Sequence, residues 1–136
     1  MATGLTLDTG ALIALERKRK GMRDVVDAAL HGKVSITVSS NSIAEWWRGR
    51  TDGREFVRDM FVVKDVDEEI AKLAGEALAK LKRRKADVDD KVTVDATVIA
   101  TAALYGPYLY TGDIEDMQRL QAFFPSVRLF GLNPSA

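Results

Sequence analysis

The chain contains no cysteine and a single histidine, His31. The absence of cysteine excludes disulfide bonds, zinc–cysteine sites and catalysis by a thiolate. His31 lies in a polar stretch between a helical pattern and a strand-like run, which is typical of an exposed loop residue, and a Ser-His-Asp mechanism would depend on it alone. The chemistry that remains is that of carboxylates, hydroxyls and cationic side chains.

The chain also lacks an excess of either charge and any long apolar run. Its 20 Lys and Arg residues balance its 20 Asp and Glu residues, which argues against a protein that coats nucleic acid through bulk charge but allows a local basic patch. No apolar run approaches the roughly 20 residues that cross a bilayer. Asp8 interrupts an N-terminal apolar stretch that has no basic residues before it, unlike a signal peptide. We therefore expect a cytoplasmic protein that has no contact with a membrane.

Short strand-like runs alternate with helical patterns along the chain. Apolar and β-branched runs predict five strands, at residues 5–7, 34–38, 61–66, 108–110 and 127–130. Apolar spacing predicts helices at 11–20, 22–30, from 39–42 onward, and at 56–61, 67–85, 92–105 and 116–123. This alternation is typical of an α/β domain with a mostly parallel sheet and helices on both faces. We expect a single domain over residues 1–132 and a short tail at 133–136.

Several cationic side chains offer places for phosphate groups. They are the run 17–20, Arg48 with Arg50, Arg54, and the run 82–85. Phosphate contacts position nucleic acid without reading its sequence. A solvated helix end is the alternative for the run 82–85, because positive charge is favoured at a helix C-terminus. Trp46 and Trp47 are adjacent and cannot share one helix face, so we expect one in the core and the other exposed.

Four acidic positions lie beside or within apolar segments, where a carboxylate is costly unless it is hydrogen-bonded, paired or bound to a cation. Asp8 follows the first strand-like run, and Asp113 lies three residues after Tyr110 in the fourth. Glu45 and Asp95 lie in predicted helices, in their N-terminal halves. Ligands of an open α/β sheet bind at the carboxyl ends of its strands. If the first and fourth strands are neighbours, Asp8 and Asp113 meet at one edge.

Carboxylate oxygens at such an edge suit Mg²⁺ or Mn²⁺. These ions activate water and orient a phosphodiester, so a protein nucleophile is not required. Each of these acids except Asp95, which apolar neighbours surround, also has a purely structural alternative. Asp8 would cap the helix predicted from Ala11, Glu45 would be a solvated helix residue, and Asp113 or Asp116 would cap the last helix.

Four stretches, in order along nearly the whole chain, resemble the PIN-domain ribonucleases and, among them, the VapC-type toxins of toxin–antitoxin pairs. They are residues 7–15 (LDTGALIAL), 42–49 (SIAEWWRG), 94–103 (VDATVIATAA) and 110–117 (YTGDIEDM). The resemblance implies a PIN-like domain with a five-stranded parallel sheet. It also implies a metal-dependent endoribonuclease that cleaves RNA phosphodiester bonds with a metal-activated water.

The resemblance also assigns the site. The residues that would hold Mg²⁺ or Mn²⁺ are Asp8, Glu45, Asp95 and Asp113. Asp116 would be an acid beside these ligands or held through water, although Met117 follows it where the family usually has Phe. Thr111 would hydrogen-bond a carboxylate or water. We expect Asp8→Ala or Asp95→Ala to abolish cleavage at little cost to folding.

The partners implied by the resemblance are RNA as substrate, a second copy of the chain, and a cognate antitoxin. The antitoxin would lie along the groove and direct an Arg or Lys toward the acids. Two alternatives come from other classes: a non-catalytic RNA- or protein-binding α/β module, and a nuclease that acts on DNA. A receiver-type signalling domain also clusters acids near its first strand, but it requires a Lys after the fifth, and none follows Phe130.

Overall fold

The computed structural model describes residues 4–47, 54–84 and 88–132. Within these ranges five strands form one sheet in the order β3-β2-β1-β4-β5, and every neighbouring pair is parallel. The strands are β1 (Leu5–Leu7), β2 (Ile36–Ser39), β3 (Val62–Lys64), β4 (Tyr108–Thr111) and β5 (Arg128–Gly131). The predicted five-stranded α/β class is confirmed. Arg48, Arg50, Lys85 and the predicted tail at 133–136 lie outside the described residues.

β1 lies at the centre of the sheet, and the strand order reverses there. The chain runs outward from β1 through β2 to β3, and then returns to place β4 on the other side of β1. Leu7 at the end of β1 is in register with Tyr110 of β4. The predicted neighbourhood of these two strands is therefore confirmed, and their carboxyl ends meet at the switch point where α/β sheets bind ligands.

The helices between the strands are α1 (Thr9–Glu16), α2 (Lys20–His31), α3 (Ser40–Trp46), α4 (Arg54–Arg58), α5 (Glu68–Arg83), α6 (Asp90–Tyr105) and α7 (Ile114–Gln121). Side-chain caps determine where several of them begin. Asp8 caps α1 and Asp89 caps α6, so both helices start two residues before the predicted position. The predicted helix 11–20 ends at Glu16 because the chain turns at Lys18, whose φ is 58°.

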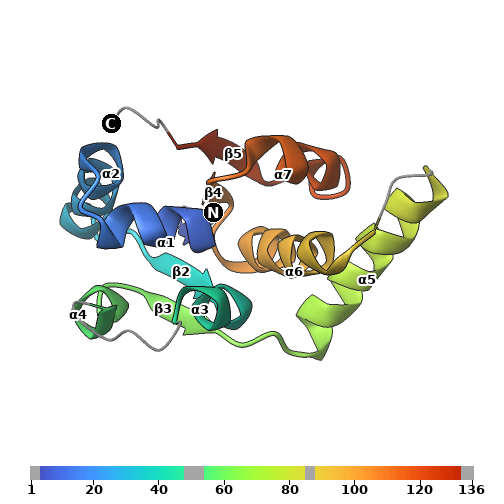
Figure 1. The fold of residues 1–136 in the computed structure, drawn as a ribbon, viewed down its shortest axis with the longest axis horizontal. Helices are drawn as coiled ribbons and strands as arrows, with labels where there is room; N and C mark the ends of the chain where they lie inside the picture. The colour runs from blue at the N-terminus through green and yellow to red at the C-terminus, as the bar shows by residue number, and fades with distance from the viewer. Residues whose placement is uncertain (1–3, 48–53, 85–87, 133–136) are drawn as a thin grey trace.

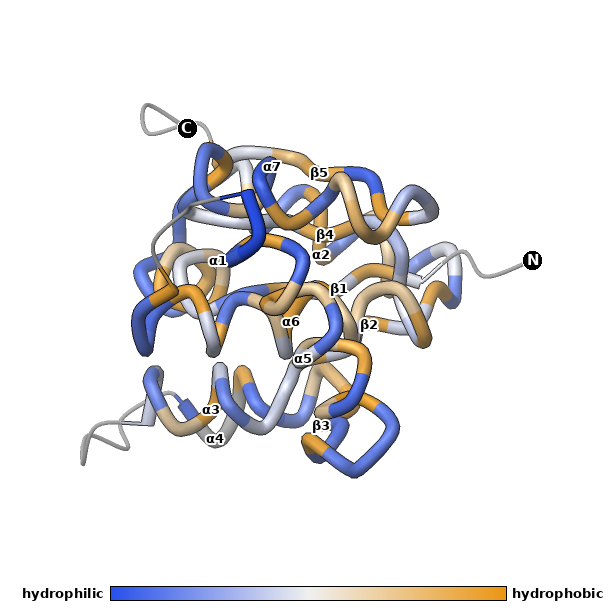
Figure 2. Tube along the Cα trace, turned by 90° about the vertical axis from the view of Figure 1, so that its right-hand side faces the viewer, coloured by the Kyte–Doolittle hydropathy of each residue, from blue (hydrophilic) through white to orange (hydrophobic). Residues whose placement is uncertain are grey.

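Apolar side chains form two clusters, one on each face of the sheet. Tyr110 packs with the cluster of α1 to α4, whereas its neighbour Leu109 belongs to the cluster of α5, α6 and α7. Successive strand residues point to opposite faces, so the helices cover both faces, as Figure 1 shows with α1 and α2 on one side and α6 and α7 on the other. In Figure 2 hydrophobic segments run through the middle of the molecule and hydrophilic ones lie around the outside.

Within the described ranges, no helix has both the length and the apolarity that a membrane crossing requires.

Candidate active site

Asp8 follows β1 directly and is 7% exposed. Its Oδ1 accepts a hydrogen bond from the amide of Ala11 at 3.0 Å, and the amide of Gly112, beyond β4, lies 3.3 and 3.2 Å from its two oxygens. Burial raises the pKa of Asp8, against the hydrogen bonds from Thr111 and the backbone, which lower it. Asp8 therefore caps α1 and also presents a desolvated carboxyl at the switch point.

The segments after β1 and β4 touch each other at two glycines. A Cβ added to Gly10 would lie 2.8 Å from the Cα of Gly112, so there is no room for a side chain at Gly10, and a Cβ on Gly112 would lie 3.1 Å from the Cα of Gly10. This close approach joins parts of the chain about a hundred residues apart. It also fixes the distance between Asp8 on one segment and Asp113 on the other.

Asp95 lies in the second turn of α6 and is half-buried. Its Oδ2 is buried and has no hydrogen-bond partner among the described residues. Burial raises the pKa of Asp95 to about 7, the ammonium group of Lys91 opposes this rise, and the negative charges of Asp8, Asp113 and Asp116 add to it. Asp95 therefore lies within the electrostatic influence of the other three acids.

Glu45 is joined to the same edge through Thr9, the residue after Asp8. The Thr9 hydroxyl donates to Oε1 of Glu45 at 2.7 Å. The expected position of Glu45 in the N-terminal half of its helix is wrong. α3 ends at Trp46, so Glu45 lies in the last turn, where the helix dipole disfavours a negative charge.

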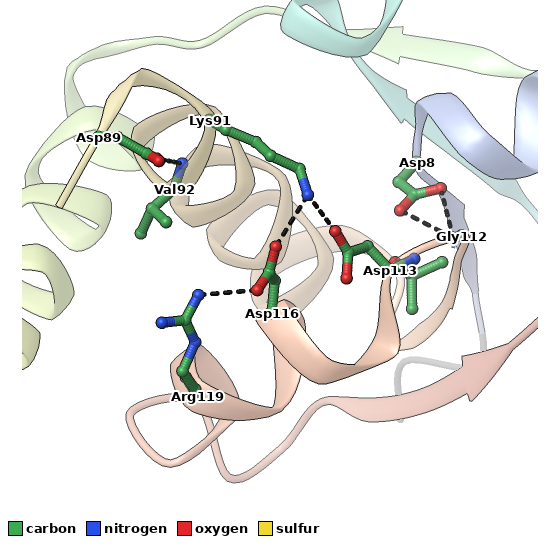
Figure 3. A network of polar contacts seen from close by, with 9 residues as sticks. Asp8, Asp89, Lys91, Val92, Gly112, Asp113, Asp116 and Arg119 are labelled. Atoms are coloured by element: carbon green, nitrogen blue, oxygen red, sulfur yellow. Dashed lines mark hydrogen bonds and ion pairs between the residues drawn. The ribbon is translucent and has the colours of Figure 1, made fainter. Parts of the chain in front are cut away.

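Asp113 and Asp116 are bridged by a lysine (Figure 3). Nζ of Lys91 donates to Oδ2 of Asp113 and, at 2.8 Å, to Oδ2 of Asp116. Arg119 donates to Oδ1 of Asp116 at 2.7 Å. The hydrogen bond from Lys91 is the main cause that lowers the pKa of Asp116. The Asp113 carboxylate makes no capping hydrogen bond to α7, although Asp113 occupies the capping position.

Thr111 is fully buried beneath this group. Its Oγ1 accepts a hydrogen bond from the amide of Asp113 at 3.0 Å, and its hydroxyl also bonds to Asp8. It therefore connects two of the acids, in line with the role that the resemblance gives it.

Sequence reasoning missed Lys91 and Thr9. Lys91 precedes Asp95 by four residues, a helical spacing that indicates a shared face, but its contacts with Asp113 and Asp116 depend on the docking of α6 against α7. Nothing in the sequence near Thr9 indicates its hydrogen bond to Glu45, because the two residues are 36 positions apart.

The donor chemistry of the site fits a divalent cation. All the grouped donors are carboxylate oxygens, which Mg²⁺ and Mn²⁺ prefer, and Asp95 keeps one buried oxygen without a partner. As the side chains stand, no three acidic or histidine side chains within the described ranges are close enough to hold an ion together. The four metal ligands, Asp8, Glu45, Asp95 and Asp113, therefore remain predictions.

A cavity of about 560 Å³ lies between α1, α2 and the ends of β4 and β5, and none of the predicted metal ligands is among the described residues that line it. Gly10 and Gly112 line its end nearest Asp8, Tyr110 lines it from the sheet, and Arg17 and Arg19 add positive charge. It offers room for a ligand with negative charge next to the switch point.

The structure corrects the interpretation of Arg54 as a phosphate contact. Arg54 is 7% exposed and donates from Nε to Oε1 of Glu16 at 2.9 Å. Oε2 of Glu16 accepts from the indole of Trp46 at 3.0 Å, which joins α1, α3 and α4. Trp46 belongs to the core, as expected for one of the tryptophans, and Trp47 is half-buried rather than exposed.

Solved structures of low sequence identity share this architecture. A chain of VapBC2 from Rickettsia felis, bound to a DNA fragment from its promoter, matches with a TM-score of 0.75 and 14% identity over 95% of this chain and 98% of its own. A chain of DNA-bound VapBC from Salmonella typhimurium matches with a TM-score of 0.71 and 18% identity over the same shares. A chain of VapBC-1 from nontypeable Haemophilus influenzae matches with a TM-score of 0.71 and 16% identity over 93% of this chain and 96% of its own.

The chain has a PIN-like fold. The resemblance that the four sequence stretches indicate is thus confirmed at the level of the fold. No family model matches the sequence, and no curated protein matches it either. Within the PIN-like fold, the four stretches supply the end of β1 with most of α1, most of α3, the middle and the C-terminal part of α6, and the end of β4 with the first half of α7. Each contributes one of the predicted metal ligands.

Proposed function

We propose that this chain is a divalent-cation-dependent endoribonuclease and the toxin of a toxin–antitoxin pair. The observation that supports the proposal is Asp95 near the β1–β4 switch point, where the charges of Asp8 and Asp113 act on it and one of its buried oxygens has no hydrogen-bond partner among the described residues. Asp8 is buried and Asp95 is half-buried, and a buried carboxylate beside other negative charges is unfavourable unless a cation offsets the charge. A metal-dependent nuclease site would explain why these carboxylates lie close together.

The residues that would hold the ion are Asp8, Glu45, Asp95 and Asp113. When bound, Mg²⁺ or Mn²⁺ activates water and neutralises negative charge on a phosphodiester. The chain's own residues orient these ligands: backbone amides fix Asp8, Thr9 holds Glu45, and Thr111 accepts from the amide of Asp113. Arg17 and Arg19, in the adjoining cavity, would position the phosphate backbone.

The likeness to VapBC complexes also supports partners for this chain. We propose a cognate antitoxin that binds along the groove beside the acids and a homodimer of the toxin. RNA is the substrate in this proposal, and the cytoplasm is the compartment where the chain would meet it.

The proposal is tested by incubating the purified chain with a cellular RNA pool in Mg²⁺, in Mn²⁺ and in chelator, and mapping the new RNA ends. We expect ion-dependent ends that Asp95→Asn and Asp8→Asn abolish and that Asp24→Asn, an exposed substitution on α2, leaves unchanged. Full activity of Asp95→Asn would reject the site assignment. Cleavage of DNA instead of RNA in a parallel reaction would favour the DNA nuclease, and RNA retention without new ends would favour the non-catalytic module.

A further inference from the structure

Lys91 brings a positive charge of the chain itself to the acidic residues after β4. Its ammonium group contacts one oxygen of Asp113 and one of Asp116, and lies in the field of Asp95 on the same helix. Of the ion pairs between described residues, this is the one in which a single cation bridges two acids of the site; Arg119 pairs with Asp116 alone. The positive charge that these acids require is thus partly supplied by the chain itself (Figure 3).

The backbone beneath Lys91 is held in place, but its side chain remains accessible. Oδ1 of Asp89 accepts from the amide of Val92 at 2.9 Å, which fixes the first turn of α6. The Lys91 side chain extends from that turn to the start of α7 and is 56% exposed. An ammonium group in this position is tethered near the acids, and it can leave them for solvent without rearrangement of the fold.

The contact with Asp113 creates a conflict with ion binding. Asp113 is a predicted ligand, and one of its two oxygens is already engaged by Lys91. A positive charge a few ångströms from a divalent cation repels it, and the two compete for the same carboxylate. In the absence of the ion, the same charge offsets the repulsion between Asp113 and Asp116.

We propose that Lys91 is a built-in counter-ion of the acidic site that competes with the divalent cation for Asp113. The inference rests on the proposed function and adds a regulator of ion binding to it. Lys91 lowers the affinity of the site for the ion and stabilises the ion-free chain. It affects the ion indirectly, by holding the carboxylates of Asp113 and Asp116.

The test is calorimetric titration of Mn²⁺ into chelator-treated wild-type chain, Lys91→Met, Lys91→Arg and Lys72→Met. We expect Lys91→Met to bind Mn²⁺ about tenfold more tightly than wild type, because it removes a charge beside the ion. Lys91→Arg keeps the charge and should stay close to wild type. Lys72→Met is the matched control, because Lys72 pairs with exposed Glu68 on α5, away from the acids. Thermal unfolding should show Lys91→Met less stable than wild type in chelator and more strongly stabilised by Mn²⁺.

The outcomes separate this inference from the proposed function. Equal Mn²⁺ affinity in wild type and Lys91→Met, or weaker binding in Lys91→Met, overturns the inference, because a purely structural Lys91 would leave affinity unchanged or lower it. The proposed function then stands if wild type still binds Mn²⁺. Failure of every variant to bind Mn²⁺ overturns both. Should Lys91→Met not fold, Lys91→Gln, which keeps a hydrogen-bond donor, is measured in its place with the same expectation.

Discussion

At the scale of single residues, the half-buried carboxyl of Asp95 should make the stability of the ion-free chain depend on pH. Burial raises its pKa to about 7 in the folded chain, whereas an unfolded Asp titrates near about 3.9. As the pH rises, the unfolded chain therefore loses this proton at a lower pH than the folded chain does. The free energy of unfolding therefore falls as the pH rises from about 4 to about 7. Above about pH 7 the carboxyl is ionised in both states, and the free energy of unfolding stays at its lowered value.

Asp95→Asn removes this titration. It should be more stable than wild type at about pH 8, by on the order of 1–2 kcal/mol after allowing for partial solvent exposure, and similar to wild type near pH 4. Urea unfolding in chelator across this range measures the difference, and Asp24→Asn on α2 controls for the loss of one exposed charge. A stability difference that did not change with pH would assign the effect to packing rather than ionisation.

Asp8 leads to a second prediction, which revises the expectation that its removal costs folding little. Asp8→Ala deletes the cap of α1 and the acceptor for the amide of Gly112, so it should lower the free energy of unfolding by about 1–2 kcal/mol or more. Asp8→Asn keeps a capping oxygen and should lose far less stability while still losing cleavage. Chemical unfolding and the RNA assay on both variants separate the two roles. Equal stability of Asp8→Ala and wild type would show that the cap contributes nothing.

The residues of the candidate site could be chosen from the sequence only in part. Asp8, Asp95 and Asp113 were identifiable because each is a charge beside or within an apolar segment. Lys91 was not, because an exposed lysine in a polar connector has many ordinary explanations and its partners are 22 and 25 residues away. Arg54 was misinterpreted because a lone arginine after a glycine gives no sign of its ion pair with the half-buried Glu16.

At the scale of elements, the ion pair of Glu16 and Arg54 should hold three helices together. Glu16 ends α1, Arg54 begins α4, and Trp46 of α3 donates to the same carboxylate. The two charged side chains are 20% and 9% exposed, so removing one partner leaves a poorly solvated charge. Glu16→Gln should lower the free energy of unfolding by about 1–3 kcal/mol.

A double-mutant cycle with Arg54→Met, followed by urea unfolding, measures the coupling between the two residues. Glu68→Gln with Lys72→Met is the matched exposed pair on α5, for which the coupling should stay below about 0.5 kcal/mol. A coupling for Glu16 and Arg54 no larger than that of the exposed pair would contradict the structural role assigned here.

The elements themselves were largely predictable, since their periodicity is local. All five strands and the order of the helices agree with the sequence patterns, and the differences lie at the ends. α1 begins at Thr9 because the preceding Asp8 accepts from Ala11, and α7 begins at Ile114 directly after Asp113. A capping hydrogen bond decides the start of α1 but not that of α7, and several residues near each boundary could have served as the cap.

At the scale of the whole molecule, the site exists only because β1 and β4 are neighbours. Asp8 and Asp113 are separated by more than a hundred residues, and the sheet brings the segments that carry them into contact at Gly10 and Gly112. The alternation of strands and helices predicted a parallel sheet, but the sequence did not predict which strands are neighbours, so the contact of β1 with β4 was only assumed. It depends on how α6 returns the chain across the sheet, which no local pattern specifies.

The contact between Gly10 and Gly112 should therefore be as important to activity as the acids themselves. A methyl group on Gly10 would lie 2.8 Å from the Cα of Gly112, closer than backbone atoms allow, so Gly10→Ala must separate the two segments. We expect it to lower the free energy of unfolding by about 1–3 kcal/mol and to abolish RNA cleavage, since Asp8 and Asp113 move apart.

Gly75→Ala is the matched control for this substitution. Gly75 lies within α5, and a Cβ there meets nothing within 4 Å, so the same change should raise stability by about 0.5–1 kcal/mol and leave cleavage intact. Urea unfolding and the RNA assay on both variants check the pair. Full cleavage by Gly10→Ala would mean that the acids act without the spacing this contact fixes, and the assignment of Asp8 and Asp113 to one ion would fail.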